Sequence, residues 1–228
     1  LAVIVTPAAA VPGVLEDCGA HDVPAAVVLS AGFRESGVAG RTLEKEVLQV
    51  ARRHGIRFIG PNCLGVMRPD IALNATFSQS MAKPGRIALV SQSGAMCTAM
   101  LDWAGPRNVG FSCVISSGIA ADIDFGEILD YLAMDPDTQA IMLYVEGIHD
   151  ARRFMSALRA ASRMGARHIV FLSDGLANRG GSTDELLGLA QELGARGVRI
   201  DTVGLGRDQD YSALSEMAAT TGGTAVVR

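Results

Sequence analysis

The sequence predicts an α/β protein of two domains, each with a parallel sheet between layers of helices. Short apolar runs rich in Val and Ile recur along the chain, and each ends in a turn that contains Gly or Ser. Such runs are typical of strands that are buried on both faces. Amphipathic stretches with helical spacing separate the runs, and this strict alternation favours parallel sheets with right-handed crossovers.

The first predicted domain covers residues 1–81. A helix is expected over residues 42–54 with Thr42 as its cap, because Leu43, Val47 and Val50 form one stripe. The weakly periodic stretch that follows the third strand closes at a Lys-Pro-Gly turn, which places a domain boundary near residue 82. The predicted strands are residues 1–5, 25–29 and 56–59, and the weakly periodic stretch is 67–83.

The second predicted domain, residues 82–228, repeats the pattern more regularly. Its expected strands are residues 86–90, 109–115, 140–145, 168–172, 198–203 and 224–227. Its expected helices are residues 95–104, 124–134, 150–164, 183–197 and 211–220.

Composition excludes several classes of function. The 228 residues include 20 Lys and Arg against 24 Asp and Glu, and these charges are scattered, so a surface for nucleic acid or an anionic membrane has no electrostatic support. No apolar run approaches the ~20 residues of a transmembrane helix. The four cysteines form no CxxC pair, which indicates neither a zinc site nor a disulfide framework. We expect a cytoplasmic fragment, begun within a strand, that acts on small molecules.

The most informative turn is Ser91-Gln92-Ser93-Gly94, which follows a strand and starts a helix. In open parallel sheets, ligands bind beyond the carboxyl ends of the strands. Free N–H groups, two hydroxyls and the positive end of a helix dipole form a site for a phosphate or carboxylate. An ordinary Ser cap, worth ~1 kcal/mol to the helix, is the alternative.

Three other strand ends are candidates. Asn62, in Gly60-Pro61-Asn62-Cys63, bonds either its own backbone or a ligand, and the alternative is a tight turn. Cys63 has no activating neighbour in sequence, which favours a structural role. Glu146 ends an apolar strand, where a desolvated carboxylate needs either a charged partner or a functional role. A cap on the next helix is an equally good alternative. Asp174 is a weak metal candidate, because one carboxylate is too few for a hard cation, so we predict no metal site.

Taken together, residues 1 to about 162 resemble the NDP-forming acyl-CoA synthetases, which include the succinyl-CoA synthetase α subunit. The resemblance implies two Rossmann-like three-layer domains, the second flavodoxin-like. The motifs that carry it are Val5 to Ala9, Leu29 to Phe33, Ile59 to Leu64 (IGPNCL), Leu73 to Phe77, Pro84 to Gly94 (PGRIALVSQSG), Asp122 to Gly126, Leu143 to Gly147 and Asp150 to Phe154.

The resemblance also implies site residues and ligands. CoA would lie near the first three strand ends, the turn after residue 90 would hold a phosphoryl group, and Glu146 would steady a phosphorylated histidine. A nucleotide with Mg²⁺ would bind to a separate ATP-grasp subunit or domain, and a small carboxylic acid would be the substrate. The implied residues are Thr6, Pro7, Ser30, Ala31, Gly32, Asn62 and Cys63 for CoA, and Ser91, Gln92, Ser93 and Gly94 for phosphate.

The chain departs from this family at the catalytic histidine. The four histidines are His21, His54, His149 and His168, and none follows the strand at residues 168–172, where the family carries its phosphorylated residue. From about residue 163 the chain instead resembles the C-terminal half of a von Willebrand factor type A domain. The residues that carry this second resemblance are 168–175 (HIVFLSDG), 178–181, 198–206 (VRIDTVGLG) and 214–223.

The expected function is therefore that of a chimeric ligase fragment. It would bind CoA and phosphate, as an NDP-forming acyl-CoA ligase does, but would not complete the phosphohistidine cycle alone. The alternative is a non-enzymatic interaction module whose surface is set by the type A-like half.

Overall fold

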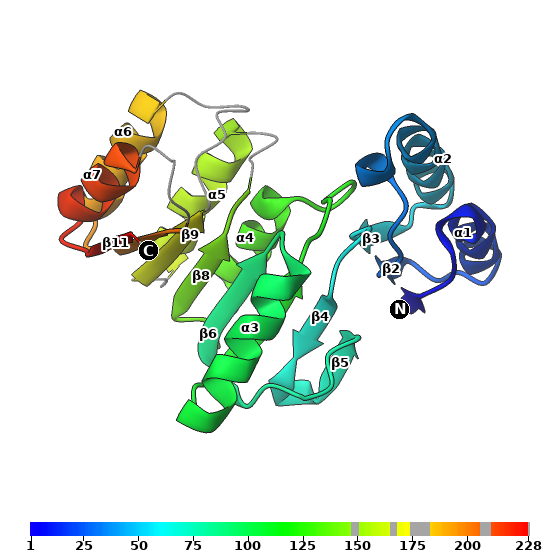
Figure 1. Ribbon diagram of the computed structural model, residues 1–228, viewed down its shortest axis with the longest axis horizontal. Coiled ribbons are helices and arrows are strands. Elements are labelled where there is room, and N and C mark those ends of the chain that lie inside the picture. The colour runs from blue at the N-terminus through cyan, green and yellow to red at the C-terminus, as the bar shows by residue number, and fades with distance from the viewer. Residues whose placement is uncertain (147–150, 165–167, 174–182, 206–210, 228) are drawn as a thin grey trace.

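A computed structural model describes residues 1–146, 151–164, 168–173, 183–205 and 211–227 (Figure 1). The chain forms a small three-stranded sheet and a large eight-stranded sheet. In the part of the chain that the structure describes, no helix combines the length and apolarity needed to cross a bilayer.

The small sheet is parallel and follows chain order. Its strands are β1 (Ala2–Ile4), β2 (Ala25–Val28) and β3 (Arg57–Ile59), joined by helices α1 (Val11–Ala20) and α2 (Val38–His54). Because right-handed crossovers that step in one direction place their helices on one side, α1 and α2 cover the same face. Their buried side chains form one core with Ile4, Val28 and Phe58.

The large sheet has the order β11-β10-β9-β8-β6-β7-β4-β5. Strands β6 to β11 are parallel, whereas β4 and β5 pair antiparallel with each other and β4 pairs antiparallel with β7. The strands are β4 (Gly65–Arg68), β5 (Leu73–Thr76), β6 (Pro84–Ser91), β7 (Phe111–Ser116), β8 (Ala140–Tyr144), β9 (His168–Ser173), β10 (Arg199–Gly204) and β11 (Ala225–Val227).

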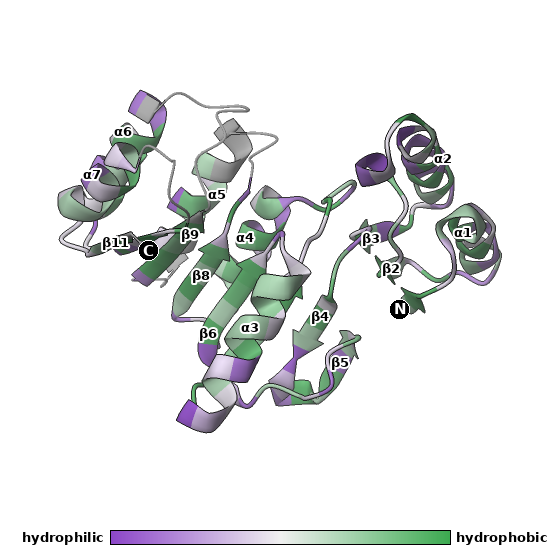
Figure 2. Cartoon of the chain, viewed as in Figure 1, coloured by the Kyte–Doolittle hydropathy of each residue, from purple (hydrophilic) through white to green (hydrophobic). Residues whose placement is uncertain are grey.

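Helices cover both faces of this sheet. Side chains of α4 to α7 share one core cluster with Val90, Ile141 and Leu143, while α3 packs through Cys97 and Leu101 on the opposite face. Strands β6 and β8 are hydrophobic over most of their length (Figure 2). The helices are α3 (Gly94–Ala104), α4 (Phe125–Met134), α5 (Ala151–Met164), α6 (Thr183–Ala195) and α7 (Ser212–Thr220).

The predicted α/β class is correct, and three details differ from the sequence-based expectation. The stretch 67–83 holds β5 and part of β4, so the two sheets divide between β3 and β4 rather than near residue 82. The small sheet carries helices on one face only. Thr42 lies inside α2 rather than at its cap, and its hydroxyl donates to the Val38 carbonyl four residues earlier.

Candidate functional site

Three loops meet at the carboxyl end of the small sheet. The hydroxyl of Ser30, after β2, donates to the Thr6 carbonyl after β1 at 2.5 Å. The backbone N–H of Asn62, after β3, donates to the Ser30 carbonyl at 2.9 Å. The residues predicted to contact CoA therefore form one connected group. Among the described residues, the Thr6 hydroxyl oxygen is buried without a hydrogen-bond partner, so its hydrogen-bonding capacity is unused.

The third of these loops is shaped by its backbone. The Gly60–Pro61 peptide is cis, and Asn62 has φ of 55°, which leaves its side chain exposed at the turn. The segment after β7 packs beneath this turn, with Ile119 N–H donating to the Pro61 carbonyl at 3.0 Å. Gly118 has φ of 54°, and a Cβ there would collide with the Pro61 and Asn62 carbonyl oxygens. Only glycine permits this close approach.

Cys63 faces inward. Its side chain is buried, and its thiol donates to the Val28 carbonyl at 3.4 Å. Burial raises the pKa of this thiol to about 12, so it stays protonated at neutral pH. The residue packs the loop from below and is not a nucleophile.

The loop after β6 lies at the point where the large sheet changes direction. The chain leaves β6 towards β7 on one side and later returns to β8 on the other, so the carboxyl end of β6 is a switch point of the kind at which open α/β sheets bind ligands. Ser91 is fully buried, and its hydroxyl donates to the Ser93 carbonyl at 2.8 Å and accepts from the Ser93 N–H at 3.0 Å. The Ser93 hydroxyl caps α3 by accepting from the Met96 N–H at 3.3 Å. Ser91 thus shapes the loop, and Ser93 and Gly94 form its more exposed rim.

Glu146 lies beside this loop. Its backbone N–H donates to the side-chain oxygen of Gln92 at 2.7 Å, and the Gln92 N–H donates to the Tyr144 carbonyl at 3.2 Å. The structure therefore brings the predicted catalytic glutamate next to the predicted phosphate loop, with its side chain exposed. The two groups of predicted residues are also adjacent, because Gly94 lies against the backbone of Leu64.

Two charged residues that the sequence did not reveal as site residues organise the loop after β2. The carboxylate of Glu35 accepts from the N–H groups of Gly32 at 2.6 Å and Phe33 at 3.1 Å. Arg34 pairs with Glu44 at 3.0 Å and donates to the Ile119 carbonyl at 3.1 Å, which ties this loop to the segment after β7. The only signal in the sequence for the contact between Glu35 and Gly32 was an acidic residue three positions after a glycine that follows a strand.

Asp174, the weak metal candidate, lies outside the described residues. Among the residues that are described, no group of three His, Cys, Asp or Glu side chains is arranged to hold a metal ion.

The fold is that of an α/β protein in which the strand-end loops of a small Rossmann-like sheet lie next to the switch point of a larger flavodoxin-like sheet. Residues 1–69 match the family described as a CoA binding domain, and residues 84–186 match the succinyl-CoA ligase like flavodoxin domain. Over these residues the chain is therefore similar to a CoA binding domain followed by a succinyl-CoA ligase like flavodoxin domain.

The relatives agree with these domain matches. ADP-forming acetate–CoA ligase I of Archaeoglobus fulgidus is 48% identical over 163 residues, which are 72% of this chain and 24% of that protein. The α subunit of ADP-forming acetate–CoA ligase I of Pyrococcus furiosus is 41% identical over 180 residues, or 79% of this chain and 38% of the subunit. The chain thus spans about a quarter to two fifths of these relatives.

A solved structure shows the same architecture. The acetyl-coenzyme A synthetase 1 of Ca. Korarchaeum cryptofilum, in complex with phosphate and ADP, superposes with a TM-score of 0.74 and 29% identity, covering 98% of this chain and 44% of that one.

Proposed function

We propose that the chain is the CoA-binding and phosphate-binding part of an ADP-forming acid–thiol ligase, and that it works with a nucleotide-binding ATP-grasp partner. The observation that carries this proposal is the junction of two loop groups at the switch point of the large sheet. One group supplies a buried, unpartnered hydroxyl at Thr6, and the other supplies a helix N-terminus at Ser93 and Gly94. The four cysteines are free thiols, in keeping with a cytoplasmic protein.

CoA would be held by the loops after β1, β2 and β3. Thr6, Ser30 and Asn62 offer hydroxyl and amide groups, and Gly32, with φ of 115°, lets the backbone come close to a ligand. The N–H groups of Gly32 and Phe33 already bind a carboxylate, that of Glu35, so they suit an anionic group of the ligand. Pro7 and Ala31 would contact CoA through their side chains, and Cys63 would pack beneath the loop. When bound, CoA supplies the thiol that accepts the acyl group.

Phosphate would be held at the start of α3. The helix dipole favours an anion at this end, and the Ser93 hydroxyl and the Gly94 backbone lie at its rim. Gln92 and Ser91 would act by fixing the loop. Glu146, joined to Gln92, is proposed to steady the phosphorylated histidine as the resemblance implies.

The chain is proposed to be incompetent alone, because no histidine follows His168 in the sequence. A direct test is incubation with radiolabelled ATP, Mg²⁺, acetate and CoA. We expect neither acid-labile protein phosphate nor thioester above background. Formation of either one would contradict the claim of incompetence.

The binding proposal is tested by calorimetric titration with CoA. We expect saturable binding that is weakened in Ser30→Ala, which loses the bond to the Thr6 carbonyl, by about fivefold for one hydrogen bond. Ser80→Ala, in an exposed loop distant in sequence, is the matched control. Absence of CoA binding, or equal affinity in both variants and the original protein, would contradict the assignment of this loop.

For residues 163–228 we propose a second origin, similar to a von Willebrand factor type A domain, in a chimeric chain. The support for this proposal is the pattern of residues 168–175 (HIVFLSDG) and 198–206 (VRIDTVGLG), together with the length of 163 residues over which the Archaeoglobus ligase is 48% identical. The succinyl-CoA ligase like match runs past this boundary, to residue 186. In the alternative function, a non-enzymatic interaction module, this part of the chain would make a divalent-ion-dependent interaction through Asp174. Binding of Mn²⁺ that Asp174→Ala abolishes would support this origin, and equal Mn²⁺ binding in both proteins would count against it.

A further inference from the structure

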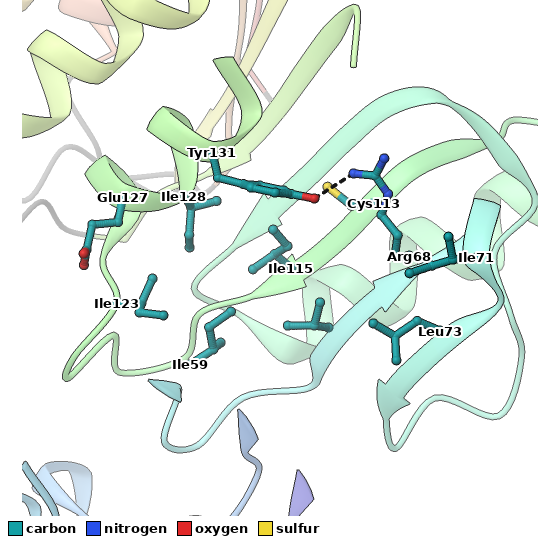
Figure 3. Close-up of a pocket in the computed structure, with 11 residues that line it drawn as sticks. Ile59, Arg68, Ile71, Leu73, Cys113, Ile115, Ile123, Glu127, Ile128 and Tyr131 are labelled. Atoms are coloured by element: carbon teal, nitrogen blue, oxygen red, sulfur yellow. Dashed lines mark hydrogen bonds between the residues drawn. The ribbon is translucent and has the colours of Figure 1, made fainter. Parts of the chain in front are cut away.

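A cavity of about 400 Å³ lies between the two sheets, and none of the residues predicted to bind CoA or phosphate lines it. It is bounded by the β4–β5 hairpin, strand β7, helix α4 and the end of β3 (Figure 3). Its volume falls within the range of about 300–1,000 Å³ that is typical of small-molecule sites. The lining residues are Ile59, Val66, Arg68, Ile71, Leu73, Cys113, Ile115, Ile123, Glu127, Ile128 and Tyr131.

Both parts of the molecule contribute to this cavity. Ile59 belongs to the small sheet, and Ile123 belongs to the segment that packs on it, whereas Val66 and Ile115 lie on paired strands of the large sheet. Arg57 fastens the two parts at the cavity's edge by pairing with Asp122 at 3.0 Å and Glu127 at 2.7 Å. A ligand here would therefore contact both sheets at once.

The charges around the cavity are compensated. Arg68 pairs with Asp70 at 2.7 Å and with Asp135 at 2.9 Å, and it also reaches Asp137 at 3.2 Å. Glu127 is held by Arg57. Neither charge is left to attract a counter-charge, and the remaining lining is almost entirely aliphatic. Such a site selects a neutral, apolar ligand.

One polar group is directed at the cavity. The Tyr131 hydroxyl oxygen accepts a hydrogen bond from Arg68 Nη1 at 2.8 Å, as Figure 3 shows, so its own proton is free to be donated. Burial raises the pKa of Tyr131, which keeps this proton in place at neutral pH. The group thus suits a single acceptor oxygen on an otherwise apolar molecule.

We propose that this cavity is a binding site for a neutral small molecule with an apolar ring system and one carbonyl or ether oxygen. The ring would pack among Val66, Ile115 and Ile128, and the oxygen would accept from Tyr131. This site does not depend on the proposed CoA and phosphate loops. Because the ligand contacts both sheets in the folded protein, it raises the temperature of unfolding.

The test uses 6-propionyl-2-dimethylaminonaphthalene, a neutral fluorophore with one carbonyl, titrated with the full chain. We expect saturable binding with a blue shift in emission. Val66→Phe fills the cavity and weakens binding at least about tenfold through lost apolar contact. Val38→Phe, at an exposed position on α2, makes the same change in side chain away from the cavity and leaves the affinity unchanged.

A second comparison isolates the hydrogen bond. Tyr131→Phe weakens binding of the carbonyl probe about threefold to tenfold. It leaves unchanged the affinity for 2-dimethylaminonaphthalene, which has no carbonyl. A purely structural role of the hydroxyl would weaken both probes alike and would overturn this part of the assignment.

The outcomes that overturn the proposal are specific. They are no saturable binding, equal affinity in Val66→Phe and the original protein, or tighter binding of the anionic probe 8-anilino-1-naphthalenesulfonate than of the neutral one. If a second copy of the chain covers the cavity, self-association would compete with the probe, and the apparent affinity for the probe would fall as the protein concentration rises. That result would also overturn the proposal. Circular dichroism verifies folding, and Leu73→Phe, on the outermost strand of the sheet, replaces Val66→Phe under the same criteria if that variant does not fold.

Discussion

In the small sheet the strands follow chain order, β1-β2-β3, and both helices lie on one face. In the large sheet the chain reverses at β6, so helices cover both faces and the loops after β6 and β8 diverge from the loop after β7. The same strand–helix unit therefore builds two different sheets. A reversal in strand order, rather than the unit itself, creates the switch point at which open α/β sheets bind ligands.

The helices of the two sheets also differ in how they begin. Side chains cap α3 and α4, where Ser93 and Asp124 accept from backbone N–H groups. In contrast, α1 and α2 of the small sheet have no side-chain cap, and α7 of the large sheet has none either. We therefore expect removal of a capping side chain to cost stability at α3 and α4.

The largest effect is expected for Leu143→Ala in β8. Leu143 is fully buried between the large sheet and its helices, and its truncation leaves a cavity that costs about 3 kcal/mol of unfolding free energy. Urea denaturation followed by the fluorescence of Trp103, on α3, measures this loss. Leu1→Ala is the control, because Leu1 is 62% exposed and its truncation changes stability by less than about 0.5 kcal/mol. A similar loss in both variants would contradict the comparison.

The next largest effect is expected for Asp135→Asn at the end of α4. The Asp135 carboxylate is nearly inaccessible to solvent and accepts hydrogen bonds from Arg68 at 2.9 Å and Thr138 at 2.5 Å. Substitution leaves the Arg68 charge less well paired and costs about 2 kcal/mol. Asp137→Asn is the control, because its carboxylate is half exposed and contacts the same arginine at 3.2 Å.

The same carboxylate predicts a pH dependence. Burial would raise the pKa of Asp135, but the hydrogen bonds from Arg68 and Thr138 outweigh burial and hold the pKa below its ordinary value. The folded state therefore binds this proton less readily than the unfolded chain. The stabilisation is complete above the unfolded pKa of about 3.9 and is lost as the pH falls through the lower folded value. Asp135→Asn should flatten the stability profile below about pH 4, and an unchanged profile would exclude this carboxylate as its source.

A smaller effect is expected for Ser93→Ala. Loss of the cap on α3 costs about 1 kcal/mol, and removal of the hydroxyl at the rim of the proposed phosphate site also lowers affinity for inorganic phosphate. Thr98→Ala, one turn along the same helix, removes a hydroxyl that bonds to the Gly94 carbonyl and serves as the control. Thermal unfolding and phosphate titration measure the two effects separately. Equal results in the two variants would remove Ser93 from the site.

Periodicity in the sequence predicted most of these elements. Apart from β4 and β5, the strands of both sheets lie within a few residues of their expected positions, as do helices α3 to α7, because each is a short apolar run or an amphipathic stripe with a clear end. The β4–β5 hairpin was missed. Its strands have four residues each, and its turn holds Ala72 with φ of 54°, so neither alternation nor a glycine marked it.

The candidate site was predicted as separate loops rather than as one arrangement. The sequence indicated Thr6, Ser30 and Asn62 because each follows a strand, but their mutual hydrogen bonds, from Ser30 to Thr6 and from Asn62 to Ser30, join residues that are far apart in the chain. It gave no means to tell the inward-facing Ser91 from the rim residue Ser93. The roles of Glu35 and Arg34 also depend on tertiary contacts, and no local pattern contains that information.

The smallest effect is expected for Val3→Thr. This substitution tests whether the face of the small sheet that carries no helices is exposed in solution. Val3 pairs in register with Val27, and the two side chains lie on the same face, opposite α1 and α2. Val3 is 44% exposed, whereas Val27 is 2% exposed because Cys63 and Ala75 pack against it. Threonine keeps the branched shape, so Val3→Thr costs less than about 0.5 kcal/mol, while Val27→Thr buries a hydroxyl and costs about 1–2 kcal/mol. Urea denaturation of both variants measures the difference. A loss at Val3 as large as that at Val27 would show that this face is buried in solution and that the contrast between the two sheets does not hold there.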